Sequence, residues 1–154
     1  MSTADQLLAA ARERGRSASL PYAGAVTPLE AWELLRAHPG ARLIDVRTNA
    51  ERHFVGQVAL PPGQHMAVEW TSWPSGMVNP QFIEQLTEIA ARDDVLLFLC
   101  RSAVRSKHAA RLATEHGFTN AYDVLEGFEG NKNGEGHRKS IEGWCFANLP
   151  WIGG

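Results

Sequence analysis

Short apolar runs alternate with helical patterns along most of this chain, and this alternation constrains its fold more than any other feature. The runs 41–46 and 95–99 have the length and composition of buried strands. Each is followed by a helical pattern, over 48–55 and 107–117 respectively. Strands that are buried on both faces and joined by helices form parallel sheets. The order therefore predicts an α/β fold, a three-layer α/β/α arrangement around a mostly parallel, roughly five-stranded sheet.

Capping and turn signals predict the remaining elements. Thr27 and Pro28, followed by Glu30, form a capping box for a helix that ends near 38–40. Asn79 and Pro80 predict the start of another capped helix with an apolar stripe, and residues 4–14 predict a short one. The segment 14–19 is interpreted as a flexible connection, and 65–68 and 121–124 as further strands. We divide the chain into an N-terminal helix and linker (1–22), a central domain (23–130) and a C-terminal extension packed on that domain (131–154).

Composition narrows the possible partners and location. The chain has 154 residues, a formal net charge of −2 and no apolar stretch long enough to span a bilayer. We therefore expect no nucleic-acid or membrane partner, and a monomer or weak homodimer. The N-terminus lacks the pattern of a secretion signal, so we expect a cytoplasmic protein. The six histidines and two cysteines show no metal or disulfide spacing, so we expect neither a metal nor another cofactor.

Cys100 ends the apolar run and stands immediately before a helical segment. At such a corner of a parallel sheet the helix presents unpaired backbone N–H groups and the positive end of its dipole. Arg101 and Arg105 add positive charge, so these features favour a thiolate over a thiol. The segment therefore predicts a reactive cysteine beside an anion-binding loop.

Several motifs in a fixed order resemble those of single-domain rhodaneses. They are Leu43–Arg47 with Glu51 and Gly56, Leu99–Ser106, Gly117–Phe118 and Leu125–Gly127, and together they span about 25–128. The resemblance implies a sulfurtransferase whose loop cysteine takes a sulfane sulfur from an anionic donor such as thiosulfate. The resulting persulfide then passes its outer sulfur to cyanide, a thiol or a protein acceptor.

The resemblance also assigns the candidate site residues. Cys100 is the expected nucleophile, and the following loop is expected to bind the substrate through Arg101, Ser102, Ala103, Val104 and Arg105. Asp45, Arg47 and Ser106 are expected to support this loop, with Asp45 and Arg47 joining loops together with Glu51. Many relatives have glycine where this chain has Ala103, and we expect Ala103 to adopt an ordinary backbone conformation.

Two other functions stay open at this point. Cysteine-dependent phosphatases and arsenate reductases also place a thiolate in a loop that ends in arginine, but with five intervening residues. Cys100 and Arg105 are separated by four, which favours a smaller ring around a single sulfur. A non-catalytic regulatory module is the other alternative, although the cysteine is present. Cys145 is interpreted as a packed thiol, with a role as an internal sulfur acceptor less favoured.

Overall fold

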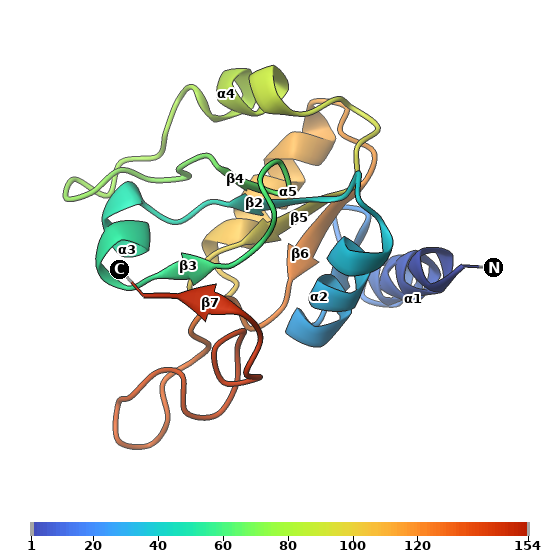
Figure 1. Cartoon of the computed structure of the whole chain (residues 1–154). Helices are drawn as coiled ribbons and strands as arrows, with labels where there is room; N and C mark the ends of the chain where they lie inside the picture. Colours follow the sequence, from blue (N-terminus) through green and yellow to red (C-terminus); the bar gives the residue numbers. More distant parts are fainter. Residues whose placement is uncertain (1, 154) are drawn as a thin grey trace.

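Seven strands and five helices make up residues 2–153, the part of the chain described in a computed structural model (Figure 1). In chain order the elements are α1 (Thr3–Ser17), β1 (Gly24–Val26), α2 (Pro28–Ala37), β2 (Arg42–Asp45), α3 (Asn49–Phe54), β3 (Gln57–Val58), β4 (His65–Ala67), α4 (Phe82–Ile89), β5 (Leu96–Leu99), α5 (Arg105–Glu115), β6 (Ala121–Val124) and β7 (Trp151–Ile152).

Five strands form one parallel sheet in the order β1-β6-β5-β2-β4. The central strand, β5, pairs with β2 on one side and β6 on the other. All four of its residues are buried, because helices cover both faces of the sheet. The predicted three-layer fold with a five-stranded parallel sheet is confirmed.

The two faces of the sheet are covered by different helices. α1 and α2 contribute Ala11, Leu34 and Leu35 to the apolar cluster on one face. α4 and α5 pack on the opposite face, in the same cluster as Cys100. Alternation along β5 sends Leu97 and Leu99 to the first face and leaves the next residue, the cysteine, on the α5 side. In Figure 1, α5 lies behind the sheet, away from the paired strands β3 and β7.

Two helices begin or end elsewhere than predicted. α1 continues to Ser17, through the segment interpreted as a flexible connection. Its last turns are held by tertiary contacts, since Arg14 bonds the carboxylate of Glu30 and the carbonyl of Ala25. α4 begins at Phe82 instead of Asn79, and no side chain caps its first N–H groups. Such long-range contacts do not show in a local pattern.

The predicted strands leave out three that the structure contains: β1, β3 and β7. β1 is a three-residue strand at the sheet edge and lies so close to α1 that a Cβ at Gly24 would come 2.1 Å from the carbonyl oxygen of Ala11. β3 and β7 are two residues each and pair in an antiparallel ribbon outside the main sheet. These strands are too short to show an alternation of apolar and polar residues, so only the tertiary fold specifies them.

The C-terminal segment supplies part of the core. Trp144 is fully buried, packs edge-on against Trp32 with ring centroids 6.2 Å apart, and donates an indole hydrogen bond of 2.9 Å to the carbonyl of Pro150. β7 then pairs with β3. Residues beyond the central domain therefore cover the face of the sheet that α2 also covers.

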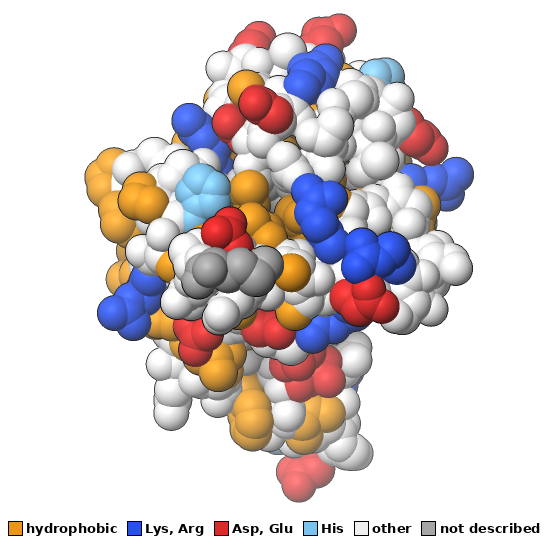
Figure 2. Space-filling model, turned by 90° about the vertical axis from the view of Figure 1, so that its right-hand side faces the viewer, with side chains coloured by type: hydrophobic (Ala, Val, Ile, Leu, Met, Phe, Trp, Pro, Cys, Tyr) orange, Lys and Arg blue, Asp and Glu red, His pale blue; other side chains and the backbone are white. Residues whose placement is uncertain are grey.

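Acidic and basic side chains alternate on the face of the molecule drawn in Figure 2. The charges on this face are therefore mixed, without one continuous basic area. None of the helices within residues 2–153 is both long enough and apolar enough to cross a membrane.

Candidate functional site

Cys100 is the first residue after β5, at the edge of the sheet where the parallel strands end. β2 ends beside it, because Asp45 pairs with Leu99 and the N–H of Val46 donates to the carbonyl of Leu99 at 2.8 Å. The loop 100–104 leads directly into α5. Only 1% of Cys100 is exposed. A reactant must therefore be slim, or the loop must move, for the sulfur atom to be reached.

The backbone of the loop offers unpaired hydrogen-bond donors. Within residues 2–153, none of the backbone N–H groups from Arg101 to Arg105 donates a hydrogen bond. Val104 occupies the N-cap position of α5, and no side chain caps the helix. Unpaired N–H groups at a helix N-terminus attract negative charge. The loop can therefore bind an anion beside Cys100.

Ala103 departs from its expected backbone conformation. Its φ is 66°, in the left-handed region, and the residue is buried. The loop has only four residues between Cys100 and Arg105, and it turns tightly enough to need one left-handed residue. For alanine this conformation costs about 1–2 kcal/mol. The expectation of an ordinary conformation at Ala103 is therefore wrong, and the loop holds strained backbone beside the cysteine.

The turn 126–130 forms hydrogen bonds with the backbone carbonyls at the start of the loop. The N–H of Phe128 donates to the carbonyl of Cys100 at 2.8 Å, and those of Glu129 and Gly130 donate to the carbonyl of Arg101 at 3.0 and 3.1 Å. A Cβ at Gly127 would lie 2.5 Å from the carbonyl of Arg101, and its φ is +74°. Only glycine fits this approach, so the Leu125–Gly127 motif holds the loop carbonyls in place.

The two loop arginines have different surroundings. Arg105 makes two hydrogen bonds to the carboxylate of Glu51, of 2.6 and 2.9 Å. Burial raises the pKa of Glu51, but the guanidinium more than offsets this and holds the pKa below its usual value. Glu51 had been expected to join Asp45 and Arg47, and it contacts Arg105 instead. Arg101 is exposed to solvent.

The loop residues between the two arginines differ in exposure. Ser102 is partly buried, whereas 61% of Val104 is exposed. Val104 therefore presents an apolar side chain to any molecule that approaches the loop. Ser102 forms no side-chain hydrogen bond within the described part of the chain, residues 2–153.

Asp45 and Arg47 form an ion pair with no exposed surface. Two bonds, of 3.0 and 2.9 Å, join the guanidinium to the carboxylate, and a third of 2.8 Å reaches the carbonyl of Gly56. The guanidinium also lies 4.2 Å from the ring centroid of Phe128, in the turn 126–130. Burial raises the pKa of Asp45, but His65, whose Nε2 lies 3.5 Å from the carboxylate, and the charge and hydrogen bonds of Arg47 lower it far below its usual range. The pair thus joins three loops at the site.

Ser106 connects Cys100 to a buried carboxyl. The cysteine Sγ lies 3.3 Å from the Ser106 hydroxyl oxygen, and this hydroxyl donates to Asp123 Oδ1 at 2.5 Å. Asp123 has no exposed surface, and its Oδ2 has no hydrogen-bond partner. Burial raises the pKa of Asp123 to about 7, against smaller opposing effects of Ser106 and Lys107. Asp123 was not among the predicted site residues, although an aspartate within a buried four-residue strand is a signal that sequence reading can use.

We expect the buried carboxyl of Asp123 to make stability depend on pH. An unfolded aspartate has a pKa near 4, so between about pH 4 and pH 7 the folded state holds a proton that the unfolded chain has lost. The free energy of unfolding therefore falls as pH rises through this window. Asp123→Asn has no titrating carboxyl at this position, so its free energy of unfolding should not fall in this way. The difference between the free energies of unfolding of the variant and the native protein should therefore shift in favour of the variant by about 2–3 kcal/mol between about pH 5 and pH 8. Urea unfolding at the two pH values measures this, and a difference that stays constant contradicts it.

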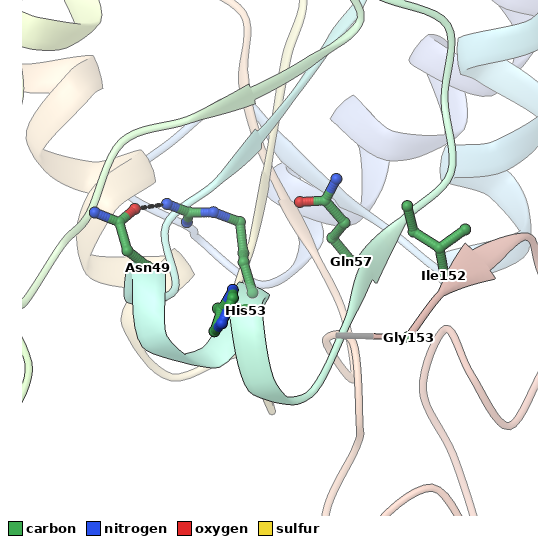
Figure 3. Close-up of a pocket in the computed structure, with 6 residues that line it drawn as sticks. Asn49, His53, Gln57, Ile152 and Gly153 are labelled. Atoms are coloured by element: carbon green, nitrogen blue, oxygen red, sulfur yellow. Dashed lines mark hydrogen bonds between the residues drawn. The ribbon is translucent and has the colours of Figure 1, made fainter.

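An open pocket of about 410 Å³ lies at the edge formed by α3, β3 and β7. Figure 3 shows its lining: Gln57 and Ile152 project from the paired strands, and Arg52 bonds the side chain of Asn49. No lining residue belongs to the loop 100–105. This pocket is therefore separate from the cysteine site.

Known proteins resemble this chain in sequence and in structure. Residues 27–133 match the rhodanese-like domain family. The uncharacterized protein RP600 homolog of Rickettsia rickettsii is 34% identical over 124 residues, which cover 79% of this chain and 91% of the relative. Thiosulfate sulfurtransferase GlpE of Haemophilus influenzae is 27% identical over 128 residues, 81% of this chain and 90% of that protein.

The crystal structure of Rv0390 from M. tuberculosis superposes with a TM-score of 0.78 at 45% identity, covering 86% of this chain and 99% of that one. The parallel sheet, the cysteine loop between β5 and α5 and the sequence match agree. The chain belongs to the rhodanese-like domain family.

Proposed function

We propose that this protein is a sulfurtransferase that carries a sulfane sulfur as a persulfide on Cys100. The observation that carries this proposal is the loop around the cysteine, where five consecutive N–H groups, 101–105, have no acceptor within residues 2–153. A persulfide places a negative sulfur atom in such a loop, and the N–H groups and the α5 dipole stabilise it. The similarity to a thiosulfate sulfurtransferase supports the same reaction.

The proposed reaction has two steps. The Cys100 thiolate attacks the outer sulfur of thiosulfate, a Cys–S–S bond forms, and sulfite leaves with the electron pair of the broken S–S bond. An acceptor, either cyanide or a thiol of a small molecule or protein, then attacks the outer sulfur and releases the thiolate. Covalent catalysis thus divides one transfer into two exchanges. Because Cys100 is 1% exposed, a donor with a slim terminal sulfur suits the site.

A cysteine-dependent phosphatase is the main rival. A phosphoryl group has three equatorial oxygens to bind, whereas the outer atom of a persulfide is a single sulfur. This loop has four residues between Cys100 and Arg105, one fewer than the loops of those phosphatases. The smaller loop favours a single sulfur over a phosphoryl group. A non-catalytic module is disfavoured because the nucleophile is retained.

Parallel assays of two reactions test the proposal. The purified protein should form thiocyanate from thiosulfate and cyanide, and it should release no phosphate from an aryl phosphate. Phosphate release without thiocyanate formation would establish the phosphatase instead. Absence of both activities would favour the non-catalytic module.

We expect Arg105→Ala to raise KM for thiosulfate about tenfold, which corresponds to about 1.4 kcal/mol of lost binding energy. Arg105 stands at the start of α5 beside the loop, and its positive charge attracts a dianionic donor. Steady-state kinetics with varied thiosulfate measure the effect. An unchanged KM would reduce Arg105 to a residue that only binds α3.

Glu51→Gln is the matched control for this prediction. Glutamine keeps the shape of Glu51 and its place in the capping box with Thr48, but it removes the charge that neutralises Arg105. If Arg105 attracts the donor, Glu51→Gln should leave KM unchanged or lower it. If Arg105 acts only through its ion pair, both variants should raise KM alike.

A further inference from the structure

We propose that Asp123 stores the proton of the Cys100 thiol, received through the Ser106 hydroxyl, for as long as Cys100 carries its persulfide. The inference rests on the proposed function for the persulfide and adds a residue to it. Asp123 is thereby a positioning residue that acts on the sulfur through Ser106, and the pair Cys100–Asp123 keeps a single negative charge through the reaction.

The contacts form one continuous chain of donors and acceptors. Cys100 Sγ lies 3.3 Å from Ser106 Oγ, which lies 2.5 Å from Asp123 Oδ1. Ser106 is fully buried, as is the aspartate. The hydroxyl has one proton, so it donates either to Asp123 or to the sulfur, and never to both at once. With Asp123 ionised it donates to the carboxylate and accepts from the thiol. With Asp123 protonated it accepts from the carboxylic acid and donates to a sulfur anion.

Burial makes two simultaneous negative charges unfavourable here. Asp123 and Cys100 have 0% and 1% of their surfaces exposed, and one hydroxyl separates them. Two anions at such short range in a poorly solvated site repel each other, so a state with one proton between the two residues is favoured over a state with none. Oδ2 of Asp123, buried without a partner, is a further sign that the carboxyl is not stabilised as an anion. The pKa of about 7 is consistent with a proton that enters and leaves near neutral pH.

The other ionisable groups around Asp123 leave the pair intact. Lys107 on α5 favours the carboxylate, but its effect is smaller than that of burial. Tyr22, from the segment before β1, faces the same carboxyl, and its own pKa is raised to about 12 by burial and by the Asp123 charge. Tyr22 therefore stays neutral. On β5, Phe98 is the residue that pairs with Asp123, and on β1 it is Ala25; neither is ionisable.

The protons balance in both steps. At rest the pair is a thiol and a carboxylate. As Cys100 attacks thiosulfate, the thiol proton passes to Ser106 Oγ, the hydroxyl proton passes to Asp123 Oδ1, and sulfite leaves, so the pair becomes a persulfide anion and a carboxylic acid. When cyanide or a thiolate removes the outer sulfur, the Cys100 thiolate recovers a proton along the same path in reverse. No proton needs to reach solvent from the buried site.

Infrared difference spectroscopy tests the stored proton directly. The spectrum of thiosulfate-treated protein minus untreated protein, at about pH 8, should contain the C=O band of a protonated carboxylic acid that shifts in heavy water. Asp123→Asn should lack the band, while Tyr122→Phe, altered on the opposite face of β6, should keep it. Mass spectrometry of the same samples counts the persulfide. A full yield of persulfide without the band overturns the proposal.

A second measurement separates this proposal from the proposed function. Alkylation of Cys100 by iodoacetamide at about pH 7 should be about tenfold faster in Asp123→Asn, because one negative neighbour of the reactive sulfur is removed. Cys145 does not interfere, since burial raises the pKa of its thiol to about 11. Tyr122→Phe, altered on the opposite face of β6, is the control and should behave as the native protein. If no persulfide forms, the sulfurtransferase proposal fails, while equal alkylation rates in the native and Asp123→Asn proteins overturn the coupling.

Discussion

Substitution of Cys100 by serine is expected to lower thiocyanate formation by roughly four orders of magnitude or more. A serine hydroxyl is a far weaker nucleophile than a thiolate, and it forms no persulfide. The fold should persist, because the serine oxygen takes a similar volume and still has Ser106 as a hydrogen-bond partner. Activity assays, with circular dichroism and thermal unfolding on the same sample, measure both effects. Substantial retained activity would remove Cys100 from the mechanism.

Cys145→Ser is the matched control for this variant. Cys145 is the only other cysteine in the sequence, and it is largely buried. Burial raises the pKa of its thiol to about 11, which leaves it protonated and unreactive near neutral pH. This variant should keep most of the activity. A loss as large as that of Cys100→Ser would instead support an internal transfer between the two sulfur atoms.

Removal of the Arg47 side chain is the change expected to cost the most stability. Arg47→Ala should lower the free energy of unfolding by about 3–5 kcal/mol, because it leaves the buried Asp45 carboxylate without its counter-charge. The carbonyl of Gly56 and the ring of Phe128 lose their contacts at the same time. Urea unfolding followed by tryptophan fluorescence measures the change.

An exposed ion pair gives the comparison. Arg111 pairs with Glu115 on the surface of α5, with 60% and 51% of the side chains exposed. Arg111→Ala should change stability by less than about 0.5 kcal/mol. Asp45→Asn should cost a similar amount, because it leaves the buried Arg47 guanidinium without its counter-charge. If Arg47→Ala were as mild as Arg111→Ala, the buried pair would not be holding the loops together.

The layers of the fold were predictable because they depend on local periodicity. β5 is an uninterrupted apolar run, and α2 begins with a capping box, so residues within a few positions of each other specify both. The ribbon of β3 and β7 was missed because its two strands are about a hundred positions apart in the sequence. Each has only two residues, too few to show an alternation of apolar and polar side chains. The end of α1 was mispredicted because its last turns are held by contacts of Arg14 with Glu30 and Ala25, which do not show in the local sequence.

At the site, residue identity was easier to predict than conformation and pairing. The sequence places Cys100 at the strand-to-helix corner with four residues between it and Arg105, and the structure has this loop between β5 and α5. The left-handed backbone at Ala103 was missed because alanine rarely adopts it, although the glycine that many relatives have at this position was a signal for it. The Glu51–Arg105 pair and the Ser106–Asp123 contact join residues 54 and 17 positions apart, and they depend on strand order.

Mass spectrometry after incubation with thiosulfate shows whether Cys100 carries the transferred sulfur. The protein should gain the mass of a single sulfur atom, located by digestion on the peptide that contains Cys100. Addition of cyanide should remove that mass and yield thiocyanate in equal amount. The account predicts no such gain in Cys100→Ser. An unmodified Cys100 peptide in a folded sample, or a sulfur atom found only on Cys145, would contradict it.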